Sequence, residues 1–132
     1  MFEYHGWVTI QATASGDDDA ALLERLVDRV HRAIRDAADV DLVDLRWSAG
    51  IPMLHFGGID KHGAQSTDLL TLFTRAGELA PGSYGLLYTW DDQDTENDNN
   101  FRVYRMARGQ VTEREDPHLT PVAPTILDTY EL

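Results

Sequence analysis

The sequence contains no cysteine, few basic residues and no long hydrophobic run. The absence of cysteine excludes disulfides, thiolate zinc sites and thiol nucleophiles. No apolar stretch approaches the roughly 18 residues that a membrane-spanning helix needs. The first ten residues, MFEYHGWVTI, lack the basic region and the long apolar run of a signal peptide. These absences predict a protein of the cytoplasm.

Positive charge is scarce, because 11 basic residues stand against 23 acidic ones and the net charge is −12. Such a field repels nucleic acid, whose binding depends on cationic side chains that neutralise phosphates. Anionic membranes are disfavoured for the same reason. A cationic protein partner is favoured, although acidity that serves only solubility explains the same charge. We therefore expect neither a nucleic-acid nor a membrane partner.

Apolar residues are numerous enough for one packed domain. The chain has 132 residues, of which 42% are hydrophobic, including three Trp, five Tyr and four Phe. A chain of this length closes a core without disulfides or metals. We expect a single domain over residues 1–132. Residues 117–132 should form an extended surface tail, since Pro117, Pro121 and Pro124 interrupt any regular element there.

Hydrophobic periodicity predicts strands and helices in alternation. Apolar and polar residues alternate over 2–12, which is typical of a half-buried strand. Helical spacing runs over 22–38, with Asp17, Asp18 and Asp19 expected in the first turn, and a second helix should start near Ser66. Further strands are expected at 42–48, 51–59, 83–90, 101–107 and 110–114. Gly57 and Gly58 predict a bulge or a close backbone approach in the second of these.

The predicted order is βαββαβ followed by two strands, which matches the ferredoxin-like split βαβ arrangement. We therefore expect an α+β fold, in which two helices cover one face of an antiparallel sheet and a C-terminal β-hairpin extends that sheet. The strand at 83–90 is apolar on both faces, which predicts an interior position. The oligomeric state stays open, although the added edge strand is a place where two copies can pair.

Five acidic residues follow the strand at 83–90 without a basic residue between them: Asp91, Asp92, Asp94, Glu96 and Asp98, here called the acidic loop. Two such charges about 4 Å apart repel by about 1 kcal/mol even in bulk water. The loop is either a well-solvated turn or a contact surface for a positive partner. We hypothesise a contact surface, with Trp90 and Trp7 as aromatic anchors. The simpler alternative for the two tryptophans is packing in the core or over the sheet.

Two metal chemistries fit parts of the sequence less well. The alternating acids of the acidic loop suggest calcium, but the glycine at position six and the Glu at position twelve of an EF-hand loop are missing. His55, Asp60 and His62 suggest a small metal-dependent or hydrolytic enzyme, yet their spacing matches no established motif. Hydrogen-bonded histidines at a strand end explain them without a metal, and His5 is a candidate neighbour of His55. We expect no metal and no cofactor.

Four segments resemble the immunity protein 7 family of bacterial polymorphic-toxin systems: FEYHGW, PGSYGLLYTWDD, NFRVYRMARGQ and DPHLTPVAPTILD. The resemblance spans 2–128 and is most specific at 81–92 and 116–128. It implies a small cytoplasmic protein without enzymatic activity, made alongside a toxin that it binds and blocks. Many toxins of such systems attack nucleic acids through cationic active sites.

The resemblance names no binding residues, so the acidic loop, Trp90 and Trp7 remain a hypothesis from chemistry. The sequence is compatible with three functions. The first is an immunity protein whose acidic surface occludes a cognate toxin domain, and a nuclease is one class of toxin that fits. The second is the enzyme built on His55, Asp60 and His62. The third is a structural or adaptor domain whose acidity serves only solubility.

Overall fold

The computed structural model describes residues 1–37, 40, 42–63 and 66–121. The predicted element order is confirmed. The elements are β1 (Phe2–Thr9), α1 (Ala20–Asp36), β2 (Leu42–Ser48), β3 (Ile51–Asp60), α2 (Ser66–Leu79), β4 (Tyr84–Asp91), β5 (Arg102–Ala107) and β6 (Gln110–Glu115). The end of the first predicted helix, at Ala38, lies outside the described residues.

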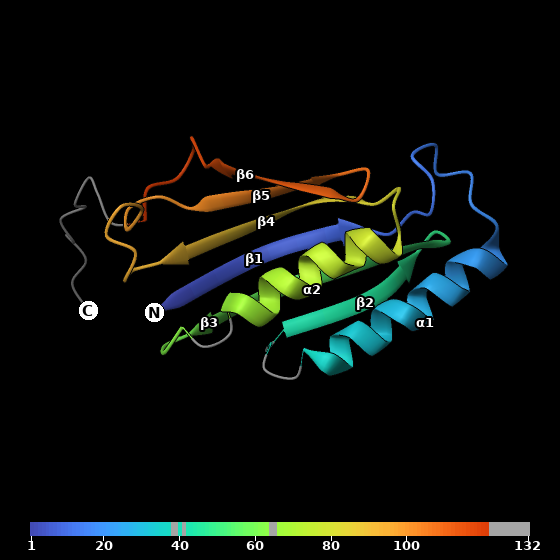
Figure 1. Cartoon of the computed structure of the whole chain (residues 1–132), viewed down its shortest axis with the longest axis horizontal. Helices are drawn as coiled ribbons and strands as arrows, with labels where there is room; N and C mark the ends of the chain where they lie inside the picture. Colours follow the sequence, from blue (N-terminus) through green and yellow to red (C-terminus); the bar gives the residue numbers. More distant parts are fainter. Residues whose placement is uncertain (38–39, 41, 64–65, 122–132) are drawn as a thin grey trace, which may run out of the picture.

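The described strands form one six-stranded sheet in the order β2-β3-β1-β4-β5-β6 (Figure 1). Every neighbouring pair is antiparallel. The order of the first four strands is consistent with the ferredoxin-like arrangement, and the β5–β6 hairpin extends the sheet next to β4. The interior position predicted for β4 is therefore confirmed, and β2 and β6 are the two edges.

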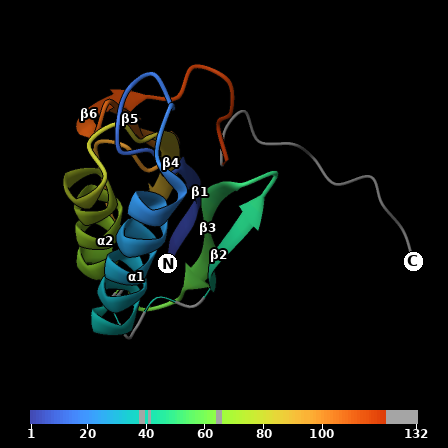
Figure 2. The ribbon, with the colours of Figure 1, turned by 90° about the vertical axis from the view of Figure 1, so that its right-hand side faces the viewer.

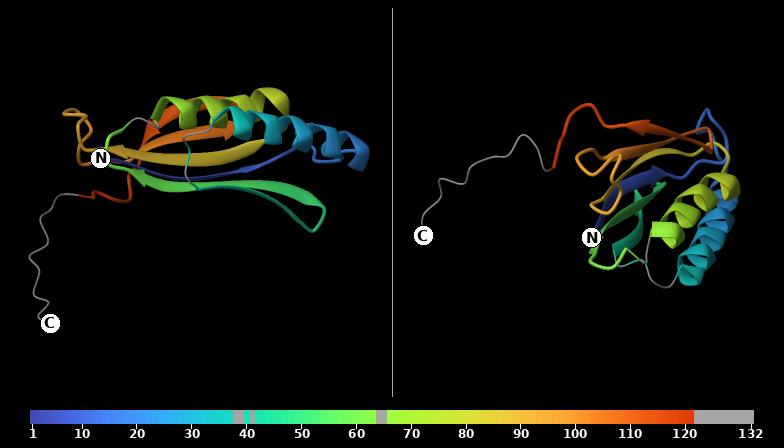
Figure 3. Two further views of the ribbon diagram at one scale, coloured as in Figure 1. Left: turned by 90° about the horizontal axis from the view of Figure 1, so that it is seen from below. Right: turned by 60° about the vertical axis from the view of Figure 1, so that its left-hand side comes forward.

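Both helices lie on the same side of the sheet, so the molecule has two layers (Figures 2 and 3). Apolar side chains at every second position of β1, β3 and β4 meet the apolar stripes of the helices, because successive side chains of a strand point to opposite faces. The buried core includes Tyr4, Val8, Ile10, Val30, Leu54, Phe56, Leu69, Phe73 and Leu87. Neither described helix covers the opposite face of the sheet, and we call it the open face.

A close approach, rather than a bulge, accounts for the glycines of β3. The β1–β3 register runs without interruption from Phe2–Asp60 to Thr9–Met53. The ring of the fully buried Tyr4 lies against Gly58, where an added Cβ would come 2.6 Å from the tyrosine hydroxyl oxygen. Gly58 therefore makes room for a large core side chain on the neighbouring strand.

Two predicted boundaries were wrong near residue 12. β1 ends at Thr9 rather than at Ala12, and α1 begins at Ala20, after the three aspartates rather than before them. The reason is the carboxylate of Asp18, which accepts the backbone N–H of Ala12 at 2.7 Å and closes the loop. Asp19 is the N-cap, and its side chain accepts the N–H of Ala21 at 3.0 Å.

After β6 the chain leaves the sheet through a turn that is also held by a carboxylate. Asp116 is buried, and its two side-chain oxygens accept the backbone N–H groups of His118 and Leu119. Residues 116–121 run round the end of the sheet to the side of the open face (Figures 2 and 3). Most of the tail predicted over 117–132 lies outside the described residues. Among the helices described, neither is long and apolar enough to cross a bilayer.

Candidate protein-binding surface

The open face carries a cluster of aromatic side chains on its two central strands. The register places three pairs side by side there: Glu3–Trp90, His5–Tyr88 and Trp7–Leu86. Trp7 also packs edge-on against Tyr84, with ring centroids 5.9 Å apart and an interplanar angle of 87°. Both predicted anchors, Trp7 and Trp90, thus lie on one face, although on different strands.

This aromatic cluster is only partly shielded from solvent. Four side chains are each half-buried on this face, which neither described helix covers: Trp7, Leu86, Tyr88 and Trp90. Tyr84 is 44% exposed. The apolar side chains around the cluster are also exposed, at 43% for Ile51, 52% for Ile59 and 67% for Leu42. The tryptophans therefore cover the sheet rather than fill the core, and a wide apolar surface reaches water.

Three of the five acids in the acidic loop are used to hold its shape. Asp91 accepts the backbone N–H of Gln93, and Asp94 accepts the N–H of Glu96 and the side-chain amide of Asn97. Asp92 forms an ion pair with the N-terminal ammonium group at 2.7 Å. Carboxylates that cap a turn in this way order the backbone around them. These contacts therefore hold the acidic loop in a defined conformation.

These contacts change the ionisation of two carboxyl groups. The hydrogen bond from the N-terminal ammonium, with a second from Gln93, lowers the pKa of Asp92 below the ordinary value of 3.8 for an aspartate. The hydrogen bond from the Asn97 side chain is the main cause that lowers the pKa of Asp94. Both groups are charged at neutral pH. The side chains of Glu96 and Asp98 are exposed, and no hydrogen bond or ion pair holds them within the described part of the chain.

The acidic loop and the open face are joined by one short hydrogen bond. The indole Nε1–H of Trp90 donates to the backbone carbonyl of Asp98 at 2.7 Å. Arg102, at the start of β5, donates to the side-chain oxygen of Asn97 at 3.2 Å and supports the loop from the other side. Trp90 of the open face is thus bonded directly to the backbone of the acidic loop.

The histidine hypotheses do not gain support from the geometry. His55 and Asp60 are five positions apart in β3, so their side chains point to opposite faces of the sheet. Asp60 is buried and accepts the backbone N–H of His62 at 3.0 Å. His5 and His55 share the open face at diagonal positions of β1 and β3, since His5 lies opposite Gly57 and His55 opposite Trp7, and the Nε2 of His5 contacts Glu3 at 3.1 Å. In the described chain, no three His, Asp or Glu side chains are arranged to hold a metal, in the acidic loop or elsewhere.

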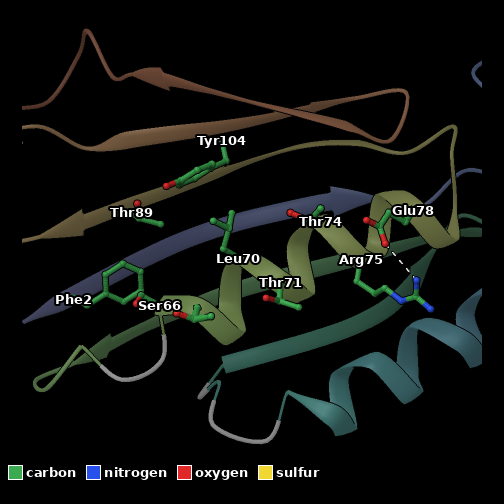
Figure 4. Close-up of a pocket in the computed structure, with 10 residues that line it drawn as sticks. Phe2, Ser66, Leu70, Thr71, Thr74, Arg75, Glu78, Thr89 and Tyr104 are labelled. Carbon is green, nitrogen blue, oxygen red and sulfur yellow. Dashed lines mark hydrogen bonds and ion pairs between the residues drawn. The ribbon is translucent and has the colours of Figure 1, made fainter.

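A separate hollow of about 500 Å³ lies on the helix side, between α2 and strands β4 and β5 (Figure 4). It exists because the β5–β6 hairpin extends the sheet beyond the two helices. Hydroxyl groups line it, contributed by Ser66, Thr67, Thr71, Thr74, Thr89 and Tyr104. At its rim Arg75 pairs with Glu78 at 3.3 Å.

Most of the side chains that line this hollow are neutral groups that can donate or accept hydrogen bonds. Burial, and then the negative charge of Glu113, raises the pKa of Tyr104 above the ordinary value of 10.0 for a tyrosine. The phenol therefore stays protonated at neutral pH and acts as a neutral donor or acceptor. The described lining contains no histidine that would activate one of the hydroxyls as a nucleophile.

Comparison with known proteins identifies the family of this chain. The family model for immunity protein 7 matches residues 1–128. The chain belongs to the immunity protein 7 family. Comparisons with curated proteins and with solved structures found no match. Membership supports an immunity role in a toxin–immunity system, which implies a toxin protein as the partner and argues for a non-enzymatic chain.

For this member of the immunity protein 7 family, sequence reasoning found two aromatic residues of the open face and missed two. Tyr84 and Tyr88 lie on the same face as Trp7 and Trp90. The sequence indicates that residues 84, 88 and 90 point to one face of β4, because they are separated by even numbers of positions. It does not reveal that Trp7 on β1 points to the same face, because this depends on the β1–β4 register.

Proposed function

We propose that this chain binds a cognate toxin domain and neutralises it by stoichiometric occlusion, in the cytoplasm of the cell that makes it. The match to the immunity protein 7 family over residues 1–128 carries the proposal. No step of this function requires a bond to be made or broken by the chain. A standard interface of about 1,600 Å² is sufficient for such an inhibitor.

The contact surface in this proposal is the acidic loop together with the adjoining part of the open face. Trp90 and Trp7 are the aromatic anchors, and Asp91, Asp92, Asp94, Glu96 and Asp98 supply the negative potential. Buried aromatic residues contribute most of the energy of a typical interface, whereas charges at the rim set the association rate and the choice of partner. The hydrogen bond between Trp90 and the loop backbone supports the two regions acting as one surface.

The charge of the chain favours a toxin with a cationic binding site, such as a nuclease. An enzyme that acts on nucleic acid needs basic side chains that contact phosphates. A protein with a net charge of −12 is attracted to such a site and associates faster at low salt. Glu96 and Asp98 are the carboxylates of the acidic loop best able to form new ion pairs, since the other three already have partners.

The alternative function, an enzyme using His55, Asp60 and His62, is not favoured. The side chains of His55 and Asp60 point to opposite faces of β3, so one substrate cannot contact both from one side of the sheet. The adaptor alternative requires no structural feature beyond a folded domain that binds a protein. It differs from the immunity proposal in the partner and in the role of the acidic residues, which in the adaptor reading serve only solubility.

The deciding experiment is co-expression with the toxin domain encoded next to this gene. We expect growth of the host to be rescued and the two proteins to co-purify at a fixed stoichiometry. The Trp90→Ala variant should fail to rescue if it remains folded by circular dichroism, and a Trp47→Ala variant serves as the control on the other side of the sheet. Absence of both rescue and co-purification with every neighbouring toxin domain would remove the proposal.

A further inference from the structure

The edge strand β2 has the features of a strand that accepts another strand. It pairs with β3 along one side, and it forms one edge of the described sheet. The β2–β3 register runs without a bulge from Leu42–Gly57 to Ser48–Ile51. The strand contains neither proline nor lysine, two of the devices by which natural sheets protect their edges from strand addition.

The two edges of the sheet differ in this respect. β6 carries three consecutive charged residues, Glu113, Arg114 and Glu115, and both of its glutamates form ion pairs with Arg102. β2 instead exposes apolar side chains on both faces: Leu42 is 67% exposed on the open face and Trp47 is 47% exposed on the helix side. An edge of this kind marks an interaction surface.

The sequence of β2, LVDLRWS, is complementary to itself when two copies run antiparallel and are centred on Leu45. Asp44 of one copy then lies directly opposite Arg46 of the other, and the symmetry repeats this pair. In the single chain Arg46 Nε already contacts Asp44 Oδ2 at 2.6 Å, and both side chains remain more than half exposed. Pairing places each carboxylate between two guanidinium groups, and opposite charges across a strand pair are favourable.

The same register also matches the apolar positions. Val43 of one copy lies opposite Trp47 of the other on the helix side, and a β-branched residue opposite an aromatic one is a favourable cross-strand pair. The contact is isologous, so it closes after two copies instead of growing into a filament. The two-fold axis runs perpendicular to the sheet, which leaves both open faces on the same side of a continuous sheet.

We propose that two copies of this chain associate through antiparallel pairing of their β2 strands, in the register that sets Asp44 against Arg46. The surface is distinct from the acidic loop and from the aromatic cluster around Trp90, which lie on the other strands. The proposal does not depend on the identity of the toxin.

Charge reversal and charge exchange test the register directly by sedimentation equilibrium of the full chain at about 0.1 M salt, where the Debye length of about 10 Å screens the net charges of the two copies more than it screens side chains in contact. We expect the unaltered chain to be a dimer in equilibrium with monomer. Asp44→Arg and Arg46→Asp should each raise the dissociation constant by about tenfold or more, because two attractive pairs become two repulsive ones. The double variant, with Asp44→Arg and Arg46→Asp together, should return the constant to within about threefold of the original, since the opposite charges face each other again.

A matched control is Arg114→Asp on the opposite edge, which changes the net charge by the same amount as Arg46→Asp. It should leave the dissociation constant unchanged. Thermal unfolding of each variant checks that these exposed substitutions leave the monomer folded. The proposal is overturned if the unaltered chain is monomeric at every concentration, if the single reversals associate like the original, if the exchange does not restore association, or if Arg114→Asp is the variant that dissociates.

Discussion

Removing charge from the acidic loop without disturbing its shape is the sharpest test of the proposed contact surface. Neutralising all five acids would also change the conformation of the loop, because three of them hold its turns: Asp91, Asp92 and Asp94. The structure instead points to Glu96→Gln combined with Asp98→Asn. Both side chains are exposed and keep their size and polarity in the variant. The net charge changes from −12 to −10, since two negative charges are removed.

The expected size of the effect follows from the exposure of these two groups. An ion pair at an exposed position contributes about 0.2–1 kcal/mol, so two pairs account for roughly twofold to thirtyfold in affinity. Most of this loss should appear in the association rate, because charges at the rim of an interface act mainly by steering. The difference should shrink as salt is added, since the Debye length falls from about 10 Å at 0.1 M to about 3 Å at 1 M.

The assay is stopped-flow association with the purified toxin domain over a range of salt concentrations. Glu24→Gln combined with Asp28→Asn is the matched control, because both residues are exposed on α1 and the net charge changes equally. These positions lie on the helix layer, away from the end of the sheet that carries the acidic loop (Figure 1). If the loop variant and the control show the same association rate and the same salt slope, the loop is not the contact.

Three further predictions concern the scaffold. Gly85→Ala should lower the free energy of unfolding by about 1–3 kcal/mol or more in urea titration, because the added Cβ would overlap the Trp7 carbonyl oxygen on β1. Trp90→Phe should cost about 0.5–1.5 kcal/mol by the same measurement, since the hydrogen bond to the loop backbone is lost while a smaller aromatic ring remains. Asp92 and Asp94 have lowered pKa values in the folded chain, so their stabilisation is present above pH 3.8 and should be lost as the pH falls below it. Asp94→Asn should make the acid limb of the stability profile shallower, and an unchanged limb would contradict this assignment.

Most of the fold was predictable because burial alternates along each strand and follows helical spacing in each helix. β4 illustrates the point, since apolar residues on both of its faces indicated an interior strand and its neighbours are β1 and β5. The boundary errors near residue 12 have a local cause. The alternating pattern continues through Ile10 and Ala12, but the backbone N–H of Ala12 binds the carboxylate of Asp18 instead of a neighbouring strand.

The candidate site was predictable only in its composition. The sequence shows five acids in the acidic loop, yet it does not reveal which of them turn toward backbone N–H groups, because that depends on the conformation of the loop. Asp94 looks no different from Asp98 in the sequence, although the first caps a turn and the second extends into solvent. The placement of Trp7 beside Tyr84 likewise required the β1–β4 register.

The open face and the acidic charge of the chain are physically connected. A sheet face that exposes Ile51, Ile59 and Tyr84 attracts apolar surfaces of any kind, including those of other copies. A net charge of −12 opposes such contacts, because copies of the chain repel one another at a distance. A cationic partner experiences the opposite force, so the same charge that suppresses unselective association would favour the proposed toxin. Pairing through β2 is compatible with this repulsion, since Asp44 and Arg46 make its contact locally neutral. We therefore expect charge to determine which partner binds the open face, and the aromatic residues to supply most of the affinity for that partner.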